Sequence, residues 1–242
     1  MNPFTTVPKF IEGYIETKRY TSLIPEMNEL RRQGRLADEK ELIRKGQKRW
    51  VEGVADKLKM SFEVSGMENF PTEEPFMIYS NHQGYADIAA ICWICKDHCQ
   101  MGFVAKEEWR KVRTLQEAIS YTRSIFLERG GGREAVRSIN EAKDVLGMGF
   151  NLAVFPEGTR SQGREMGEFK PGAFKFAEKG NVPILPVTID GSYKFFEEKG
   201  TWQPCNIKIT VHPLVHIEKM SKHEQKEAAI EIERTIRSAI LL

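Results

Sequence analysis

The stretch PFMIYSNHQGYADIAAICWI (75–94) is the part of the sequence that decides the fold. PFMIYS is a short apolar run typical of a buried strand, and Asp87–Lys96 is predicted to be a helix. The polar residues between them include His82 and Asp87, five positions apart, and Gly84, which permits a sharp bend. The stretch therefore predicts a strand, a tight turn that carries an imidazole and a carboxylate, and a helix.

Apolar strands and amphipathic helices continue to alternate from residue 61 onward. Further strands are predicted at 61–67, 101–105, 124–128, 151–155, 182–189 and 206–211. Further helices are predicted at 109–122, 133–146 and 171–179, the last with Pro at its first turn and Gly180 just past its end, and near the C-terminus, where Ser221 and Glu224 have capping-box spacing. This alternation predicts an α/β fold with a mostly parallel central sheet flanked by helices.

Residues 1–60 differ from the rest of the chain because they are charged and helical throughout. Ile43, Trp50, Val54 and Leu58 fall near helical spacing, so one face of this segment can be buried. We therefore expect an N-terminal helical arm (1–60) followed by an α/β domain (61–242). Apolar side chains near the start either pack on that domain or enter a lipid interface, and the sequence leaves both open for Phe4, Phe10, Ile11, Tyr14 and Ile15.

The composition is that of a globular protein with one buried core. Of the 242 residues, 40% are hydrophobic and 29% are charged, and no apolar run approaches the roughly 20 residues that span a bilayer. The start lacks the pattern of a signal peptide, and four cysteines do not suggest a disulfide scaffold, so a cytoplasmic location is expected. The net charge of +2 gives no indication of a nucleic-acid partner. Two basic runs, 31–35 and 43–49, are either solvated helix faces or sites of attraction to an anionic membrane.

His82 and Asp87 have the residue types of a general base and its orienting partner. A carboxylate on one imidazole nitrogen fixes the tautomer and leaves the other nitrogen to accept a proton. The chain contains no G-x-S-x-G sequence that would supply a serine nucleophile. One interpretation is that the substrate brings its own nucleophile, an alcohol that His82 deprotonates. The alternative is that the pair is only a helix cap with a satisfied polar contact.

The second polar loop, FPEGTRS (155–161), follows the apolar strand NLAVF and has features of a phosphate site. Arg160 offers a planar fork that matches phosphate oxygens, and Gly158 lets the backbone approach a ligand closely. Glu157 is expected either to hold the Arg160 guanidinium or to contact a hydroxyl. Taken singly, each cation is more simply explained as a surface residue. Other candidate ligands of a phosphate are Arg129, Thr159, Ser161 and Lys170.

The two loops together resemble the glycerolipid acyltransferases typified by 1-acyl-glycerol-3-phosphate acyltransferase. The first family motif, N-H-x-x-x-x-D, is matched by Asn81, His82 and Asp87, and the third, F-P-E-G-T-R-S, is matched throughout at 155–161. A second motif is matched loosely by Lys106–Glu107 and Arg129, and a fourth, V-P-I-x-P-V, by Val182–Val187. The resemblance covers about residues 61–215.

This resemblance implies an acyl transfer that gives phosphatidic acid. His82, oriented by Asp87, would take the proton from the free hydroxyl of lysophosphatidic acid, and the oxygen would attack the thioester of acyl-CoA or acyl-carrier protein. Arg160 with Arg129 would hold the acceptor phosphate. The other residues implied in substrate binding are Glu157, Gly158, Thr159, Lys106 and Lys170. The resemblance implies no metal and no bound cofactor, although Cys92, Cys95, His98 and Cys99 have a spacing also found in zinc sites.

The sequence departs from the family pattern at three places. Gly84 stands where the family often has Ser, the run RKVRTLQEA (110–118) replaces a Pro- and Gly-containing signature, and a charged arm replaces the membrane helices of many relatives. We therefore expect peripheral contact of residues 1–60 with the inner face of a membrane. The alternatives are the same chemistry on glycerol-3-phosphate or another lysolipid, a membrane-binding relative without catalysis, and a hydrolase that releases fatty acid to water.

Overall fold

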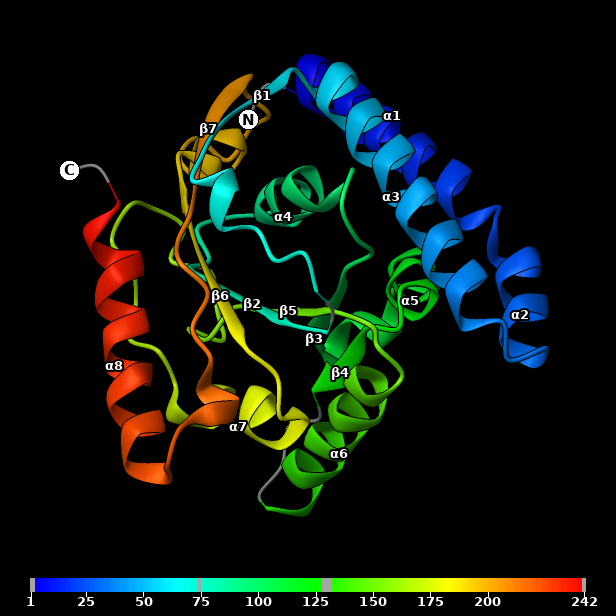
Figure 1. Ribbon diagram of the computed structural model, residues 1–242. Helices are drawn as coiled ribbons and strands as arrows, with labels where there is room; N and C mark the ends of the chain where they lie inside the picture. Colours follow the sequence, from blue (N-terminus) through cyan, green and yellow to red (C-terminus); the bar gives the residue numbers. More distant parts are fainter. Residues whose placement is uncertain (1–2, 74, 128–131, 241–242) are drawn as a thin grey trace.

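A seven-stranded sheet lies at the centre of the computed structural model, which describes residues 3–73, 75–127 and 132–240 (Figure 1). The strand order is β1-β7-β6-β2-β5-β3-β4. All neighbouring strands are parallel except β6 and β7, which are antiparallel. The predicted mostly parallel α/β fold is therefore confirmed. The strands are β1 (Met60–Ser65), β2 (Met77–Ser80), β3 (Gly102–Lys106), β4 (Ile125–Leu127), β5 (Leu152–Val154), β6 (Ile184–Asp190) and β7 (Cys205–Val211).

Helices cover both faces of this sheet. Side chains of α3 and α4 pack with the sheet in one apolar cluster, and side chains of α6, α7 and α8 pack with it in a second (Figure 1). The helices are α1 (Pro3–Thr21), α2 (Ile24–Arg32), α3 (Leu36–Leu58), α4 (Asp87–Cys95), α5 (Arg113–Tyr121), α6 (Arg133–Gly147), α7 (Pro171–Gly180) and α8 (Lys222–Ser238), with short 3-10 helices η1 (Met67–Asn69), η2 (Glu107–Lys111), η3 (Ser192–Phe195) and η4 (Ile217–Lys219).

The N-terminal arm is helical, as predicted, and it packs on the rest of the protein. Val51, Val54 and Leu58 of α3 are buried in the same apolar cluster as α4. The basic runs of the arm are largely ion-paired: Arg31 contacts the buried Glu39, and Lys48 contacts Asp97. These pairs favour a solvated helix face for the basic runs. Within the described ranges, no helix combines the length and the apolar character that crossing a bilayer requires.

Most strand and helix ends lie within two residues of those predicted from the sequence, and two helices differ in a further way. The single helix expected at 109–122 is interrupted at Val112, whose extended backbone separates η2 from α5. Gly180 was expected to follow the end of its helix, but it is the last residue of α7, and Asn181 takes the left-handed conformation at φ 55°. A Cβ atom on Gly180 would lie 2.3 Å from Cδ1 of Leu146, so this glycine allows α6 and α7 to approach closely.

Candidate active site

Three loops that follow neighbouring parallel strands form the candidate site. The strands β6, β2 and β5 are adjacent and parallel, so their carboxyl ends lie at one edge of the sheet. The loop after β2 carries His82, the loop after β5 carries Arg160, and the segment after β6 carries Glu197. Ligands of α/β proteins with open sheets commonly bind at this edge, outside the carboxyl ends of the strands.

His82 and Asp87 are in direct contact, as their spacing predicts. The distance from Nδ1 of His82 to Oδ2 of Asp87 is 2.6 Å, and the same oxygen accepts the backbone N–H of Gly84 at 2.9 Å. The Asp87 side chain is fully buried, whereas 19% of the His82 side chain is exposed. With its Nδ1 occupied by the carboxylate, the imidazole has its Nε2 left for a substrate proton.

Neighbouring side chains fix the position of His82. The Phe155 ring stacks on the imidazole, with 4.1 Å between ring centroids and 15° between planes. Asn81 pairs with the backbone of Ile189 in β6, donating to its carbonyl and accepting from its N–H at 2.8 Å each. Gln83 accepts the N–H of Gly191 at 2.9 Å. The sequence singled out Asn81 only as part of a motif, and it gave no indication of the Gln83 contact.

The phosphate-loop candidate is joined to the His82 loop through its backbone. The N–H of Ser161 donates to the His82 carbonyl at 2.7 Å, and the N–H of Gln162 donates to the Gln83 carbonyl at 3.1 Å. These bonds place FPEGTRS beside the candidate base, although the two segments are more than 70 residues apart in sequence.

Glu157 is a second link between these loops. Its Oε1 accepts the backbone N–H of His82 at 2.6 Å, and its Oε2 accepts the N–H of Gly167 at 2.8 Å. Burial raises the pKa of this carboxyl, against the two backbone hydrogen bonds, which lower it. The sequence allows Glu157 either to hold the Arg160 guanidinium or to contact a hydroxyl. Its two oxygens accept backbone N–H groups and the guanidinium pairs with Glu197, so only the contact with a hydroxyl stays a prediction.

The guanidinium of Arg160 is held by two residues that no sequence motif selects. Its centre lies 3.7 Å from the centroid of the Tyr85 ring, a cation–π contact. Its Nη1 donates to Oε1 of Glu197 at 2.9 Å. The same Glu197 oxygen accepts the backbone N–H of Tyr85 at 2.9 Å. Arg160 is therefore held beside the His82 loop, and 27% of its side chain is exposed.

Lys170 is a second cation at this loop. Gly158 has a φ of +68°, and a Cβ atom built there would lie 2.9 Å from Nζ of Lys170. Both Lys170 and Thr159 are exposed, and among the described residues Lys170 has no carboxylate partner. The lysine amine thus lies over the glycine of FPEGTRS and is available to an anionic ligand.

The other predicted ligands are placed less directly. Lys106 is the last residue of β3 and is partly buried, and no described contact joins it to the His82 loop. Arg129 lies outside the described residues, so its predicted contact with an acceptor phosphate stays a prediction.

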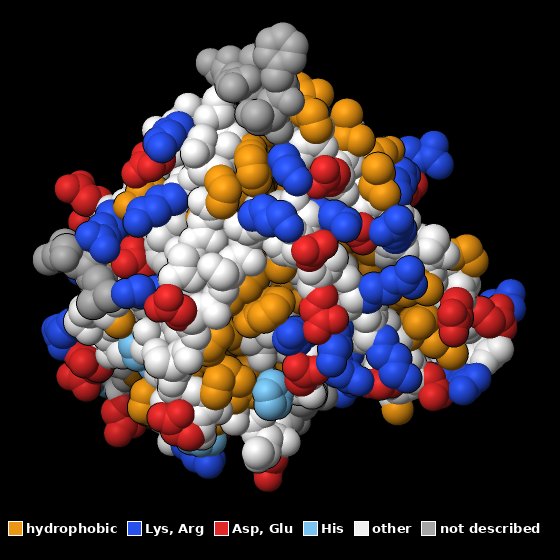
Figure 2. Space-filling model, turned by 90° about the horizontal axis from the view of Figure 1, so that it is seen from above, with side chains coloured by type: hydrophobic (Ala, Val, Ile, Leu, Met, Phe, Trp, Pro, Cys, Tyr) orange, Lys and Arg blue, Asp and Glu red, His pale blue; other side chains and the backbone are white. Residues whose placement is uncertain are grey.

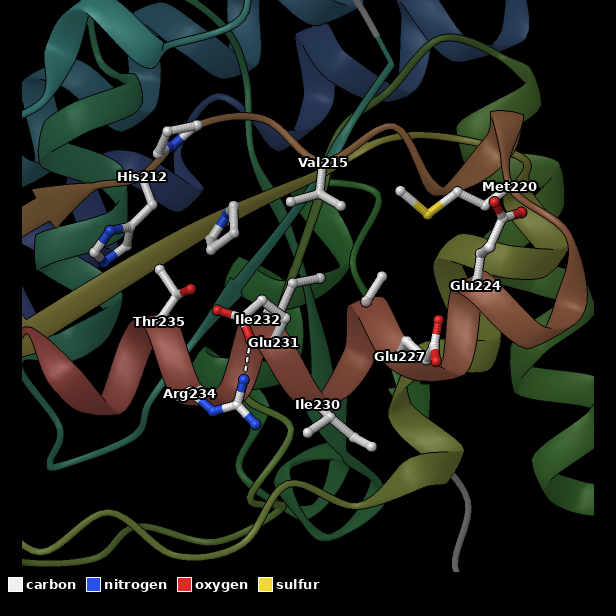
Figure 3. Close-up of a pocket in the computed structure, with 13 residues that line it drawn as sticks. His212, Val215, Met220, Glu224, Glu227, Ile230, Glu231, Ile232, Arg234 and Thr235 are labelled. Atoms are coloured by element: carbon white, nitrogen blue, oxygen red, sulfur yellow. Dashed lines mark hydrogen bonds and ion pairs between the residues drawn. The ribbon is translucent and has the colours of Figure 1, made fainter.

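Two features lie apart from these loops. Cys92, Cys95 and Cys99 are buried in the core, and in the described part of the chain no three His, Cys, Asp or Glu side chains are grouped to hold a metal ion. A hollow of about 730 Å³ lies between α8 and the segment that carries His212 and Val215 (Figure 3). Its lining includes no described residue of the His82 or Arg160 loops.

Comparisons with known proteins agree with the motifs. The family model described as Acyltransferase matches residues 61–190. The 1-acyl-sn-glycerol-3-phosphate acyltransferase of Borreliella burgdorferi is 30% identical over 178 residues, 73% of this chain and 68% of that protein. The chloroplastic 1-acyl-sn-glycerol-3-phosphate acyltransferase of Arabidopsis thaliana is 30% identical over 156 residues, 63% of this chain but only 43% of that protein.

A solved structure has the same fold over nearly the whole chain. The crystal structure of the 1-acyl-sn-glycerophosphate acyltransferase PlsC from Thermotoga maritima covers 99% of this chain, and the match takes in 96% of that protein. The TM-score is 0.79 and the sequence identity is 26%. The likeness therefore includes the N-terminal helices as well as the sheet.

Proposed function

The chain belongs to the acyltransferase family, as its motifs predicted, and from this premise we propose that it transfers a fatty acyl group to the free hydroxyl of lysophosphatidic acid. The product would be phosphatidic acid, and the donor would be a thioester, either acyl-CoA or acyl-carrier protein. The acceptor is the one named for the Borreliella and Thermotoga proteins. The proposal is thus a 1-acylglycerol-3-phosphate O-acyltransferase of phospholipid biosynthesis.

The observation that carries this proposal is the 2.6 Å contact between Nδ1 of His82 and Oδ2 of Asp87. In the proposed reaction Nε2 of His82 takes the proton of the acceptor hydroxyl, and Asp87 stabilises the imidazolium that forms. The deprotonated oxygen attacks the thioester carbonyl carbon. The C–S bond then breaks, and the thiolate receives the proton from His82. These reaction steps balance in atoms and protons, and none of them uses a metal or a bound cofactor.

Arg160 and Lys170 are the proposed ligands of the acceptor phosphate. Both cations belong to loops at the same sheet edge as His82, and an arginine fork matches the oxygens of a phosphate. Gly158 and Thr159 would shape this part of the site, and Glu157 would hold it to the His82 backbone. By the resemblance, Lys106 and Arg129 would also bind substrate.

We further propose that α1 contacts the inner face of a membrane and delivers the lipid acceptor. Val7, Phe10, Ile11, Tyr14 and Ile15 are all exposed and lie on one face of the helix. Figure 2 shows hydrophobic side chains gathered beside Lys and Arg over the N-terminal helices. Exposed apolar surface of this kind suits a lipid interface.

A chain of aromatic rings joins this helix to the candidate site. Phe10 lies edge-on to Phe196, with 5.4 Å between ring centroids, and Phe196 lies 6.1 Å from Tyr85. Tyr85 in turn carries Arg160 on its ring face. A lysolipid held at α1 would therefore have its headgroup near the proposed phosphate ligands, which supports the choice of a membrane-borne acceptor.

A lipid assay with the purified full chain tests the function. Palmitoyl-CoA and palmitoyl-carrier protein are each supplied with lysophosphatidic acid, with glycerol-3-phosphate or with no acceptor. His82→Ala is assayed beside the wild type, and His223→Ala, a change at an exposed histidine of α8, is the matched control. We expect phosphatidic acid from the wild type and the control only.

Other outcomes of this assay would indicate a different acceptor, a different function or a different base. Product from glycerol-3-phosphate alone would change the acceptor but keep the chemistry. Fatty acid released without an acceptor would indicate a hydrolase. No product from any pairing would contradict the proposal and favour a membrane-binding role without catalysis. Activity of His82→Ala near the wild-type value would contradict the role of the base.

A further inference from the structure

Glu197 is a buried carboxylate at the candidate site that no motif of the sequence selects. It lies just after η3, and only 3% of its side chain is exposed. Its Oε1 accepts two hydrogen bonds of 2.9 Å, from the backbone N–H of Tyr85 and from Nη1 of Arg160. Its Oε2 is buried without a hydrogen-bond partner among the described residues.

The fit of this carboxylate depends on the absence of a side chain at Gly84. A Cβ atom on Gly84 would lie 2.5 Å from Oε2 of Glu197 and 2.8 Å from its Cδ. Such distances are too short for real contacts, so any side chain at position 84 would displace the carboxylate from its place. Gly84 is also within the His82 turn, where its N–H donates to Asp87. Gly84 thus contacts the Asp87 partner of His82 through its backbone and leaves room for Glu197, the partner of Arg160.

The contact with Glu197 leaves one edge of Arg160 free. Glu197 occupies Nη1, and no acceptor for Nε or Nη2 is found among the described residues. Nε and Nη2 together form the side edge of the guanidinium, which binds two oxygens of a phosphate or carboxylate in parallel. The Tyr85 ring closes one face of the guanidinium and so limits its rotation.

We propose that Glu197 is a positioning residue for the acceptor: it holds Arg160 by Nη1 so that the Nε–Nη2 edge faces the acceptor phosphate. This inference rests on the proposed function, because it assigns Arg160 to that phosphate. It makes Gly84 and Glu197 a coupled pair, in which the glycine provides the space that the carboxylate fills. Burial raises the pKa of Glu197, and the hydrogen bond from the Tyr85 backbone and the charge of Arg160 offset only part of this rise.

Steady-state kinetics of Glu197 variants test the positioning role. In Glu197→Ala, Arg160 loses its anchor, and we expect the KM for lysophosphatidic acid to rise about 10-fold while kcat and the donor KM stay within about twofold. In Glu197→Gln the amide oxygen still accepts from Tyr85 and Arg160, and we expect a rise in acceptor KM of no more than about threefold. Glu198→Ala, at the exposed neighbour, is the matched control.

A double-mutant cycle tests the coupling between the two residues. Gly84→Ala alone displaces the carboxylate and should weaken acceptor binding about as much as Glu197→Ala, whereas in the Glu197→Ala background it should add less than about twofold. If Glu197→Ala does not fold, Gly84→Ala still tests the positioning role, because it keeps the Glu197 side chain but displaces its carboxylate. Additive effects, or an unchanged acceptor KM in Glu197→Ala, would overturn the proposal.

Direct binding separates this inference from the proposed function. Calorimetric titration with monomeric lysophosphatidic acid gives the Kd of each member of the cycle without turnover. A wild type that binds this lipid but transfers no acyl group would refute the proposed function. The coupling between Gly84 and Glu197 could then still be measured from the Kd values of the four proteins. A wild type that does not bind it at all would overturn both proposals. Binding that weakens in Glu197→Ala and recovers in Glu197→Gln supports the positioning role.

Discussion

The backbone N–H of His82 donates to Oε1 of Glu157 at 2.6 Å, so the candidate base and the FPEGTRS loop form one hydrogen-bonded unit. The other oxygen of Glu157 accepts the N–H of Gly167 at 2.8 Å, which extends the unit to the end of the loop. A displacement of either loop is therefore transmitted to the other. Active sites tolerate such displacements poorly, because a misplacement of about 1 Å can cost about 100-fold in rate.

Glu157→Gln should weaken both the fold and the activity. A glutamine offers one oxygen to two backbone donors, so one buried N–H loses its partner at a cost of about 1–3 kcal/mol. We expect that loss in the free energy of unfolding, measured by urea denaturation, together with a decrease in kcat of about 10-fold or more. Glu165→Gln, at an exposed position of the same loop, is the control. A variant with wild-type stability and kcat would contradict the linking role of Glu157.

Asp87→Asn should reduce turnover and leave acceptor binding intact. The carboxylate fixes the imidazole with Nδ1 toward Asp87, and an amide no longer stabilises the imidazolium that forms when His82 takes a proton. We expect kcat to fall about 100-fold or more, with the acceptor KM within about twofold. Asp97→Asn, which changes an exposed aspartate, is the control. A raised acceptor KM with unchanged kcat would assign Asp87 to binding instead.

Arg160→Lys should show the opposite pattern. A lysine keeps the charge but cannot offer two parallel N–H groups to a phosphate while a third contacts Glu197. We expect the acceptor KM to rise about 10-fold, with kcat and the donor KM nearly unchanged. Arg234→Lys on α8 is the matched control, because that arginine pairs with Glu231 on the surface. A fall in kcat alone would show that Arg160 acts on the transition state only.

His212 should make the fold less stable in mild acid. Its Nε2 lies 2.8 Å from Oγ1 of Thr188, and burial lowers its pKa below the ordinary 6.5. The unfolded chain therefore binds a proton more readily than the folded one, so stability is complete above the unfolded pKa and is lost as pH falls through it toward the folded pKa. The free energy of unfolding between about pH 7 and 5 should fall less steeply in His212→Gln than in the wild type.

The exposed His223 provides the control for this measurement. His223→Gln is also a change of histidine to glutamine, and 83% of the His223 side chain is exposed. We expect His223→Gln to keep the wild-type slope of stability against pH. Equal slopes for His212→Gln and the wild type would show that His212 makes no contribution to the acid sensitivity of the fold.

The parts of the site that the sequence predicts are those encoded locally. His82, Gly84 and Asp87 lie within one turn, so their spacing alone indicates the contact that the structure contains. The strand preceding each loop is a short apolar run, and parallel strands place the following loops at one edge. The fold class, the two loops and their order could therefore be predicted.

The rest of the site depends on contacts between distant segments. Glu197 is 37 residues from Arg160, and it reaches the guanidinium because β6 and β5, the strands that precede the two residues, both lie beside β2. The segment YKFFEEKG (193–200) has no motif that would indicate this contact. Glu157 is close to Arg160 in sequence, but its two oxygens accept the backbone N–H groups of His82 and Gly167. Of the two roles that the sequence allows for Glu157, holding the guanidinium belongs to Glu197.

The exposed apolar face of α1 should provide most of the affinity of the protein for lipid vesicles. Ile11 and Ile15 are 53% and 44% exposed and lie one turn apart, so a double change to serine removes apolar surface from the face without disturbing the core. We expect the wild type to sediment with vesicles of phosphatidylglycerol and phosphatidylcholine at low salt. The Ile11→Ser, Ile15→Ser variant should bind about 10-fold more weakly, because full burial of each such side chain contributes about 1.5–3 kcal/mol and these sites gain only part of it.

Ile230→Ser on α8 is the matched control, because that isoleucine is 61% exposed but lies on a different helix. It should bind vesicles as the wild type does. A wild type that stays in the supernatant at low salt would contradict membrane contact. The acceptor would then have to reach His82 from solution, and vesicles would not be needed for turnover.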